Sequence, residues 1–235
     1  MQPDLYRDLY RDPHRDLYRD RRHAGRVLAR HLAAFAGRPG ITVFALPRGG
    51  VPVGYEVARA LQATLDIYVV RKLGVPGMME CAMGALAQNG DVTLDDAVLN
   101  AMSISPAAFD EVLRAERSEL ERRVRRYRDD RPLPDLRGRD AIVVDDGLAT
   151  GSTMEVAVRA IRALQPERIV VAVPVGSDDA CARLAAVADE VICASRPARF
   201  RSVGEAYEDF EQIDDNEVRD LMVLARRVCG SRDAA

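Results

Sequence analysis

The chain has 235 residues, a length that suits one α/β domain, and its formal net charge is −3. This charge gives no global basic footprint for nucleic acid, and no apolar run is long enough to span a membrane. The four cysteines are scattered without the spacing of a metal site, so we expect reduced thiols in a cytoplasmic protein.

The N-terminal segment repeats a tetrapeptide. Residues 4–19 read DLYR, DLYR, DPHR and DLYR. A period of four would align like side chains along one face of a helix, but Pro13 interrupts it. We interpret residues 1–19 as a peripheral arm. A helical arm that docks on a partner subunit is the alternative.

The rest of the chain alternates strands with helices. Hydrophobic periodicity predicts helices at residues 20–35, 53–61, 105–129, 154–164, 178–188 and 214–228, and strands at 41–46, 65–70, 82–87, 92–94, 141–144, 168–174 and 190–193. Residues 71–80 contain Gly and Pro and are predicted to be a loop. This alternation favours a mostly parallel sheet flanked by helices, with right-handed crossovers. No stretch is typical of an interdomain linker, so residues 20–235 are predicted to form a single domain.

The first candidate ligand loop follows the first predicted strand. Arg48, Gly49 and Gly50 stand between that strand and the next helix. The glycines let the backbone approach a ligand, and the guanidinium can fork onto phosphate oxygens. A plain glycine turn is the alternative.

A basic pair follows the next predicted strand. Arg71 and Lys72 would lie at the carboxyl end of that strand, where α/β sheets bind ligands, and two cations there suit a polyanion. A solvated basic pair is the alternative. Glu80, in the predicted loop, is the nearest candidate acid or base, although an exposed loop glutamate is the simpler interpretation.

The most informative segment is Asp140 to Thr153. It reads as a buried strand, two carboxylates (Asp145 and Asp146), a small turn rich in hydroxyls, and a helix start. A helix N-terminus suits a phosphate, and carboxylates accept hydrogen bonds from sugar hydroxyls or bind a divalent cation. The segment therefore indicates a phosphorylated sugar as ligand. An ordinary strand–turn–helix, in which the aspartates cap the loop, is the alternative.

This segment resembles the signature of the type I phosphoribosyltransferases. The resemblance implies that Asp145 and Asp146 hold the ribose hydroxyls of phosphoribosyl pyrophosphate (PRPP), directly or through Mg²⁺. It further implies that the following turn holds the 5′-phosphate, through Ala149, Thr150, Gly151, Ser152 and Thr153. The loop of Arg48, Gly49 and Gly50 resembles the family's pyrophosphate loop, and Arg71 with Lys72 resembles a pair that contacts pyrophosphate in orotate and adenine enzymes.

Residues 199–210 resemble the C-terminal hood of the hypoxanthine-guanine enzymes, although the spacing here is one residue longer. We expect a hood at about 195–213, in which Phe200 would stack on the base and Asp209 would meet its edge or a metal. A Phe/Tyr packing cluster is the alternative. The hypoxanthine-guanine enzymes carry Asp at the position of Ala149, whereas adenine enzymes carry Ala there, so proton handling must come from elsewhere.

Together these motifs predict a Mg²⁺-dependent phosphoribosyltransferase that acts on PRPP and an unidentified nitrogenous acceptor. The match is with a bacterial group of phosphoribosyltransferases whose substrate is unassigned. A PRPP- or nucleotide-binding regulatory module without turnover is the alternative, since fold does not fix function. A phosphatase or hydrolase lacks a visible nucleophile. We expect a homodimer.

Overall fold

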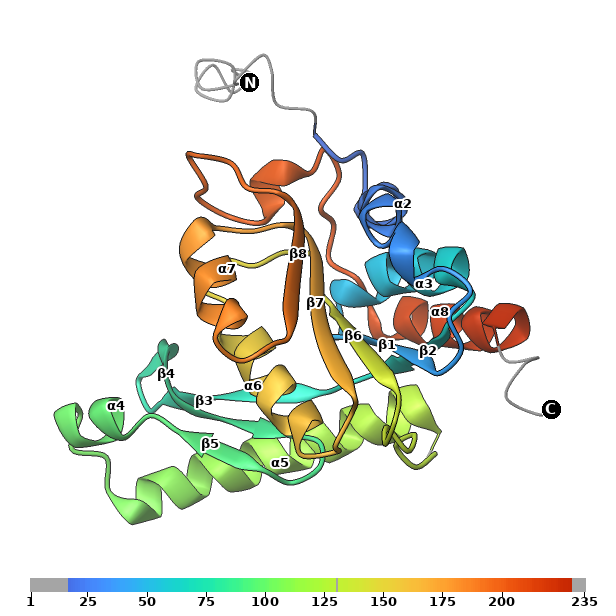
Figure 1. Ribbon diagram of the computed structural model, residues 1–235. Helices are drawn as coiled ribbons and strands as arrows, with labels where there is room; N and C mark the ends of the chain where they lie inside the picture. Colours follow the sequence, from blue (N-terminus) through green and yellow to red (C-terminus); the bar gives the residue numbers. More distant parts are fainter. Residues whose placement is uncertain (1–16, 130, 230–235) are drawn as a thin grey trace, which may run out of the picture.

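The structure is a computed structural model that describes residues 17–129 and 131–229 (Figure 1). Its centre is a five-stranded parallel sheet in the order β2-β1-β6-β7-β8. The strands are β1 (Ile41–Ala45), β2 (Thr64–Ile67), β6 (Asp140–Val144), β7 (Arg168–Val175) and β8 (Glu190–Ser195). This architecture confirms the predicted α/β fold with a mostly parallel sheet.

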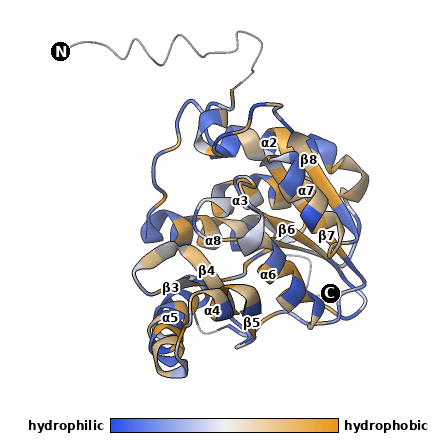
Figure 2. Ribbon diagram, turned by 90° about the vertical axis from the view of Figure 1, so that its left-hand side faces the viewer, coloured by the Kyte–Doolittle hydropathy of each residue, from blue (hydrophilic) through white to orange (hydrophobic). Residues whose placement is uncertain are grey.

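Helices cover both faces of this sheet (Figure 1). One face carries α2 (Arg21–His31), α3 (Gly50–Leu61) and α8 (Asp215–Cys229), and the other carries α6 (Ser152–Arg162) and α7 (Asp178–Ala185). Successive strand residues serve opposite faces: Val43 packs with the first group of helices, whereas Phe44 and Val143 pack with the second. Because both faces are covered, the strands are mostly apolar, and β6, β7 and β8 are largely orange in Figure 2.

A second, three-stranded antiparallel sheet corrects the loop predicted at residues 71–80. It consists of β3 (Val70–Val75), β4 (Met78–Ala87) and β5 (Val92–Leu94). The glycines and proline that suggested a loop occupy a tight hairpin turn and a register irregularity in the β3–β4 ladder. The turn at Asn89-Gly90 connects β4 to β5. The short helix α4 (Asp96–Ala101), capped by the Asp95 side chain, was not predicted.

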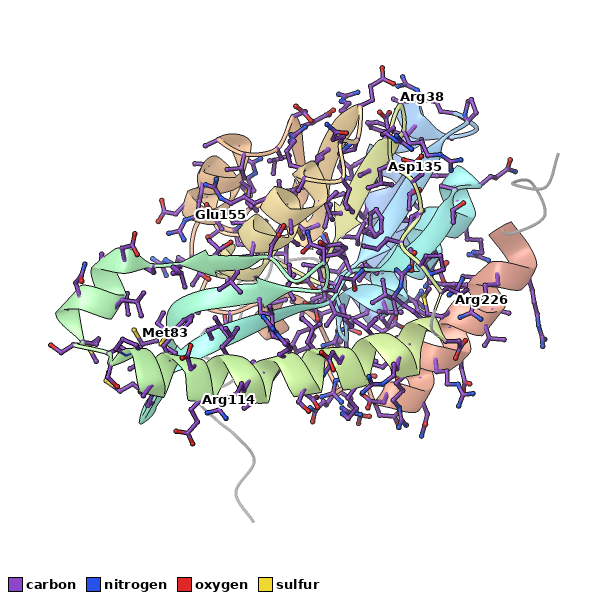
Figure 3. The ribbon with its side chains drawn as sticks, turned by 90° about the horizontal axis from the view of Figure 1, so that it is seen from below. Arg38, Met83, Arg114, Asp135, Glu155 and Arg226 are labelled. Carbon is purple, nitrogen blue, oxygen red and sulfur yellow. The ribbon has the colours of Figure 1, made fainter. Side chains whose placement is uncertain are left out.

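Helix α5 (Pro106–Arg128) runs along the three-stranded sheet (Figure 3). Ser105 accepts a hydrogen bond from Ala108 N and Pro106 lies in the first helical turn, at the start of the helix predicted over residues 105–129. Its C-terminal end is tied to the main sheet by Arg128, which is 2% exposed and lies 2.7 Å from Asp66 of β2. The 3₁₀ helix Ala33–Phe35 completes the segment after α2.

The segment between β8 and α8 forms the hood, residues 196–214, which includes a 3₁₀ helix at Gly204–Ala206. In Figure 1 it returns across the top of the sheet to the start of α2. Backbone hydrogen bonds join it there to the last DLYR copy: Tyr18 N donates to Ala206 O, and Glu208 N donates to Tyr18 O. Tyr18 is buried, and its hydroxyl donates to Pro174 O at 2.8 Å. Residues 1–16, which carry the other three copies, lie outside the described residues.

Within the part of the chain that the structure describes, no helix combines the length and the apolar character that a membrane crossing requires.

Candidate functional site

The acidic pair lies directly after β6, at the carboxyl end of the parallel sheet. Asp145 and Asp146 are both only partly exposed. Oδ1 of Asp145 accepts a hydrogen bond from the backbone N–H of Asp146 at 2.9 Å. The central position of β6 between β1 and β7 places these carboxylates among loops from several strands.

The glycine loop after β1 packs onto the acidic pair. A Cβ on Gly49 would collide with Oδ2 of Asp146, and one on Gly50 would lie 2.9 Å from Cα of Asp145. A Cβ at Gly50 would meet backbone, so only glycine fits there, whereas a Cβ at Gly49 would displace the Asp146 carboxylate. The peptide bond before Arg48 is cis. The sheet register thus brings two separate sequence motifs into one site.

The hydroxyl-rich turn leads into α6. Gly151 has φ +76° and forms the N-cap of this helix, a backbone conformation that glycine adopts readily. Thr150 and Ser152 join their hydroxyls at 3.2 Å, and both side chains are exposed beside the N–H groups of the first helical turn. Oγ of Ser177 donates to Ala149 O at 2.9 Å, which fixes the turn against the end of β7. This loop has the donors and the exposure of an anion site.

Burial raises the pKa of both carboxyl groups of the acidic pair. Burial first, and the charge of Asp146 second, raise the pKa of Asp145 well above its usual range. Burial also raises the pKa of Asp146, while the hydrogen bond from Arg21 opposes that rise. A divalent cation or sugar hydroxyls at this position would favour the charged carboxylates.

Arg21, which sequence reasoning missed, is the cation bonded to this pair. Its Nε donates to Oδ2 of Asp146 at 2.8 Å, and its Nη1 donates to the carbonyl oxygen of Glu211 in the hood at 2.7 Å. The guanidinium carbon lies 3.8 Å from the centre of the Phe210 ring. No spacing signal separates Arg21 from the other arginines of its helix, so only tertiary structure identifies it.

Tyr207 also joins the hood to the acidic segment. Its hydroxyl donates to the backbone carbonyl of Asp146 at 2.5 Å, and its ring packs 5.5 Å from that of Tyr18. Burial and the nearby Asp146 charge raise the pKa of Tyr207, so the phenol stays protonated as a donor. In the sequence, only its place in the DLYR repeat distinguished Tyr18 from other tyrosines, and the repeat did not indicate that Tyr18 packs against the hood.

The side chain of Arg48 points to the start of α8. Its Nη1 lies 3.6 Å from Oδ1 of Asp215, which also accepts the Tyr127 hydroxyl at 2.5 Å. The other carboxylate oxygen of Asp215 lies 3.4 Å from Nη1 of Arg122. The glycine loop is thus linked through Arg48 to both α8 and α5, a connection that the sequence did not reveal.

The basic pair is not placed as predicted. The strand β2 ends at Ile67, and Arg71 and Lys72 belong to the antiparallel strand β3 instead of following the parallel strand directly. Arg71 pairs with Glu116 of α5 at 2.6 Å. Tyr68 and Val69 are hydrophobic, so the sequence between β2 and β3 showed no break, and the two strands were predicted as one at residues 65–70.

Three further predicted residues are not part of the loops around the acidic pair, and the side chain of one of them, Glu80, is not described by the structure. Phe200 is partly buried and packs with Tyr18 and Tyr207, an arrangement that matches the alternative of a packing cluster. Asp209 is exposed, and its Oδ1 accepts from Glu211 N at 3.0 Å. Glu80 lies on β4, and its side chain lies outside the described structure.

The donor set suits a hard divalent cation only in part. Among the described residues, no group of three or more His, Cys, Asp or Glu side chains is arranged to hold a metal ion. Two adjacent carboxylates do provide oxygen ligands of the kind that Mg²⁺ prefers. Mg²⁺ at this site would therefore need further oxygens from water or from a phosphorylated ligand.

Comparison with known proteins places the chain in a family. The model of the phosphoribosyl transferase domain matches residues 17–209. Two Mycobacterium tuberculosis proteins, each named "Putative phosphoribosyl transferase" (MT0597 of strain CDC 1551 and Rv0571c of strain H37Rv), are 46% identical over 215 residues, which is 90% of this chain and 48% of each relative. The chain thus spans about half the length of these curated relatives.

A solved structure is similar over most of the chain. The protein TT1426 from Thermus thermophilus is 42% identical, with a TM-score of 0.76 over 89% of this chain and 99% of that one. An α/β fold with an acidic pair, a glycine loop and a hydroxyl-rich turn at one sheet edge defines the class. The chain belongs to the phosphoribosyl transferase family.

Proposed function

We propose that the protein transfers the 5-phosphoribosyl group of PRPP to a nitrogenous acceptor and releases pyrophosphate. The observation that carries this proposal is the packing of Gly49 and Gly50 onto Asp145 and Asp146, next to the exposed turn at the start of α6. A ligand that has a phosphate, vicinal hydroxyls and a second anionic group matches these three parts. Family membership supports the same reaction.

The proposed reaction forms a bond between an acceptor nitrogen and C1 of the ribose. The bond between C1 and the pyrophosphate oxygen breaks, and its electron pair leaves with pyrophosphate, while the acceptor nitrogen loses its proton to solvent or to a base not yet assigned. Positive charge develops on the ribose and negative charge on the leaving group. Positioning and electrostatic stabilisation would therefore dominate the rate enhancement.

Each part of the site has a role in this proposal. The acidic pair would accept hydrogen bonds from the ribose hydroxyls and lie beside the developing positive charge. Backbone N–H groups and hydroxyls from residues 149–153 would bind the 5′-phosphate. The loop of Arg48, Gly49 and Gly50 would bind pyrophosphate, although the N–H of Gly50 already donates to Leu46 O. Mg²⁺, when bound, would neutralise pyrophosphate charge and share oxygens with the acidic pair.

The test is pyrophosphate release from PRPP with Mg²⁺ across a panel of purines, pyrimidines and other nitrogen heterocycles. Release above the acceptor-free background with one compound is the expected result, and it would also identify the acceptor. Omission of Mg²⁺ should abolish that release. Absence of release with every acceptor would contradict the proposed turnover.

A second candidate is a PRPP-binding regulatory module without turnover. Two observations favour it: Ala149 cannot act as an acid or base, and the charged group beside Asp146 is a side chain of the protein itself, Arg21. This candidate predicts PRPP binding in calorimetry together with no pyrophosphate release under any acceptor. The release panel therefore separates the two candidates.

A further inference from the structure

Arg21 is buried although it carries a permanent charge. It is 8% exposed, whereas arginines are rarely buried unless they are paired. The Asp20 side chain accepts from His23 N at 2.6 Å and so fixes the start of α2, which places Arg21 in the first helical turn. The position of the side chain is therefore set by a helix cap and not by a flexible segment.

The guanidinium contacts the acidic pair and the hood at the same time. One N–H group binds Asp146, another binds the carbonyl of Glu211, and the flat face lies over Phe210. Nε also lies 3.3 Å from the position that a Cβ on Gly49 would occupy. Arg21 thus stands where the acidic pair, the hood and the glycine loop meet.

These contacts depend on one another. The hood covers the guanidinium, so separation of the hood from Arg21 would admit water and weaken the bond to Asp146, and loss of that bond would free Arg21 from the position that holds the hood. An ionised carboxylate can accept about four hydrogen bonds, so the bond from Arg21 leaves Asp146 capacity for sugar hydroxyls. Arg21 can accordingly orient Asp146 while a ligand binds it.

We propose that Arg21 is a positioning residue that couples the hood to the acidic pair, so that a ribose bound by Asp146 holds the hood segment 207–211 in place. The ribose part of this statement rests on the proposed function. The coupling itself does not, because the bonds of Arg21 join two parts of the protein itself. Tyr207, which donates to the Asp146 backbone, is a second connection that keeps the hood near the site when Arg21 is changed.

The first arm of the test needs no ligand. Hydrogen exchange would be followed at the amides of Glu208 and Asp209, which donate to Tyr18 O and Arg19 O. In Arg21→Gln we expect these amides to exchange about tenfold faster or more, while β1 and β6 exchange as in the wild type. Unchanged exchange of the hood amides would overturn the coupling.

The chain offers a matched control on the same helical turn. Arg22 is largely exposed, lies 3.9 Å from Glu56 and stacks on Tyr55, and both of these partners belong to α3. Arg22→Gln should leave hood exchange unchanged. Equal loosening of the hood in both variants would mean that any charge loss from α2 has this effect, and would overturn the specific role of Arg21.

Arg21→Lys guards against a variant that fails to fold. Lysine keeps the charge but lacks the planar fork that reaches Asp146 and Glu211 together. We expect the lysine variant to fold and to show hood exchange between those of the wild type and Arg21→Gln. Wild-type exchange in Arg21→Lys would contradict the requirement for two simultaneous bonds.

The second arm adds PRPP with Mg²⁺. In the wild type the ligand should slow exchange of the hood amides, and in Arg21→Gln that response should be lost, with the PRPP affinity about tenfold lower. In turnover assays the loss should appear mainly in KM, because Arg21 orients a group that binds the ground state. A kcat loss with unchanged KM would contradict the positioning role. Failure of the wild type to bind PRPP would remove the proposed function, and the first arm would still decide the coupling.

Discussion

At the scale of single residues, the site depends on positions where an added side chain would displace a neighbouring group. Gly49 is the sharpest case, because a Cβ there would collide with Oδ2 of Asp146 and crowd Nε of Arg21. The glycine is needed for the contact between two loops, since its φ of −60° is open to any residue. The sequence indicated a close backbone approach at this glycine but not which group approaches.

Gly49→Ala should therefore impair ligand binding more than folding. The new methyl group displaces the Asp146 carboxylate, so we expect the PRPP affinity to fall about tenfold or more, as measured by calorimetry. Gly37→Ala is the control, because its Cβ would meet nothing within 4 Å. Its φ of +71° should cost about 1–2 kcal/mol of stability and leave PRPP binding intact. Wild-type affinity in Gly49→Ala would contradict the placement of the site.

Some candidate residues are placed by local sequence patterns, and others are placed only by tertiary contacts. Asp145, Asp146, Gly49 and Gly50 were predictable because each follows a strongly apolar strand, and parallel strands bring their carboxyl ends to one edge. Arg21 was not predictable, because its partners lie 125 and 190 residues away and helix periodicity carries no information about them.

At the scale of elements, α5 joins the small sheet to the main one through a buried ion pair. Arg128 bonds Asp66 at 2.7 Å and also donates to the carbonyl oxygens of Ile67 and Pro132. Burial is the largest influence on Asp66 and raises its pKa, although Arg128 opposes the rise. Removal of either partner of this pair should therefore lower the free energy of unfolding.

Arg128→Ala should leave the Asp66 carboxylate buried without its cation. We expect a loss of about 3–5 kcal/mol in the free energy of unfolding, measured by urea denaturation. Arg137→Ala is the control, because Arg137 and Asp135 form an exposed pair at 2.7 Å whose loss should change the free energy of unfolding far less. Similar losses in the two variants would show that burial of the Arg128 pair has no energetic consequence.

A second connection between elements, at Asp215, gives stability a pH dependence. The hydrogen bond from Tyr127, followed by the bond from Arg122, lowers the pKa of Asp215 below its unfolded value. A carboxylate with a depressed folded-state pKa contributes stability above its unfolded pKa and loses it as the pH falls. The contribution should therefore be full near neutral pH and decline below about pH 4.

Asp215→Asn should reveal this contribution as a difference from the wild type. We expect the variant to be less stable by about 1–2 kcal/mol at neutral pH, with the difference shrinking as the pH falls below about 4. Urea denaturation at a series of pH values measures it. A difference that stays constant with pH would mean that the Asp215 charge has no part in the stability.

The elements themselves show where sequence patterns succeed. The strands of the main sheet and the helices between them follow from apolar runs and caps, and the Ser105-Pro106 start of α5 was visible directly. The hairpin of β3 and β4 was missed because glycine and proline there serve a tight turn and an irregular ladder, which look like a loop when read locally. Strand pairing depends on tertiary contacts, which local composition does not predict.

At the scale of the whole molecule, the chain gathers its candidate site from segments far apart in sequence. Arg21 near the N-terminus, the acidic pair in the middle and the hood near the C-terminus meet at one edge of the sheet. The last DLYR copy pairs with the hood and so belongs to this assembly. The homodimer expected from the family remains a prediction. This chain matches only 48% of each curated relative, so an activity of the other half is not attributed to this chain.

The most direct test of the central claim is a calorimetric titration of PRPP with Mg²⁺ into the wild type and into the double variant Asp145→Asn, Asp146→Asn. Asparagine keeps the size of each side chain but replaces a charge-assisted acceptor, so the double variant should fold and lose PRPP binding. Saturable binding by the wild type alone is the predicted result. Equal affinity in the two proteins, or no binding by the wild type, would contradict the assignment of the acidic pair as a phosphoribosyl site.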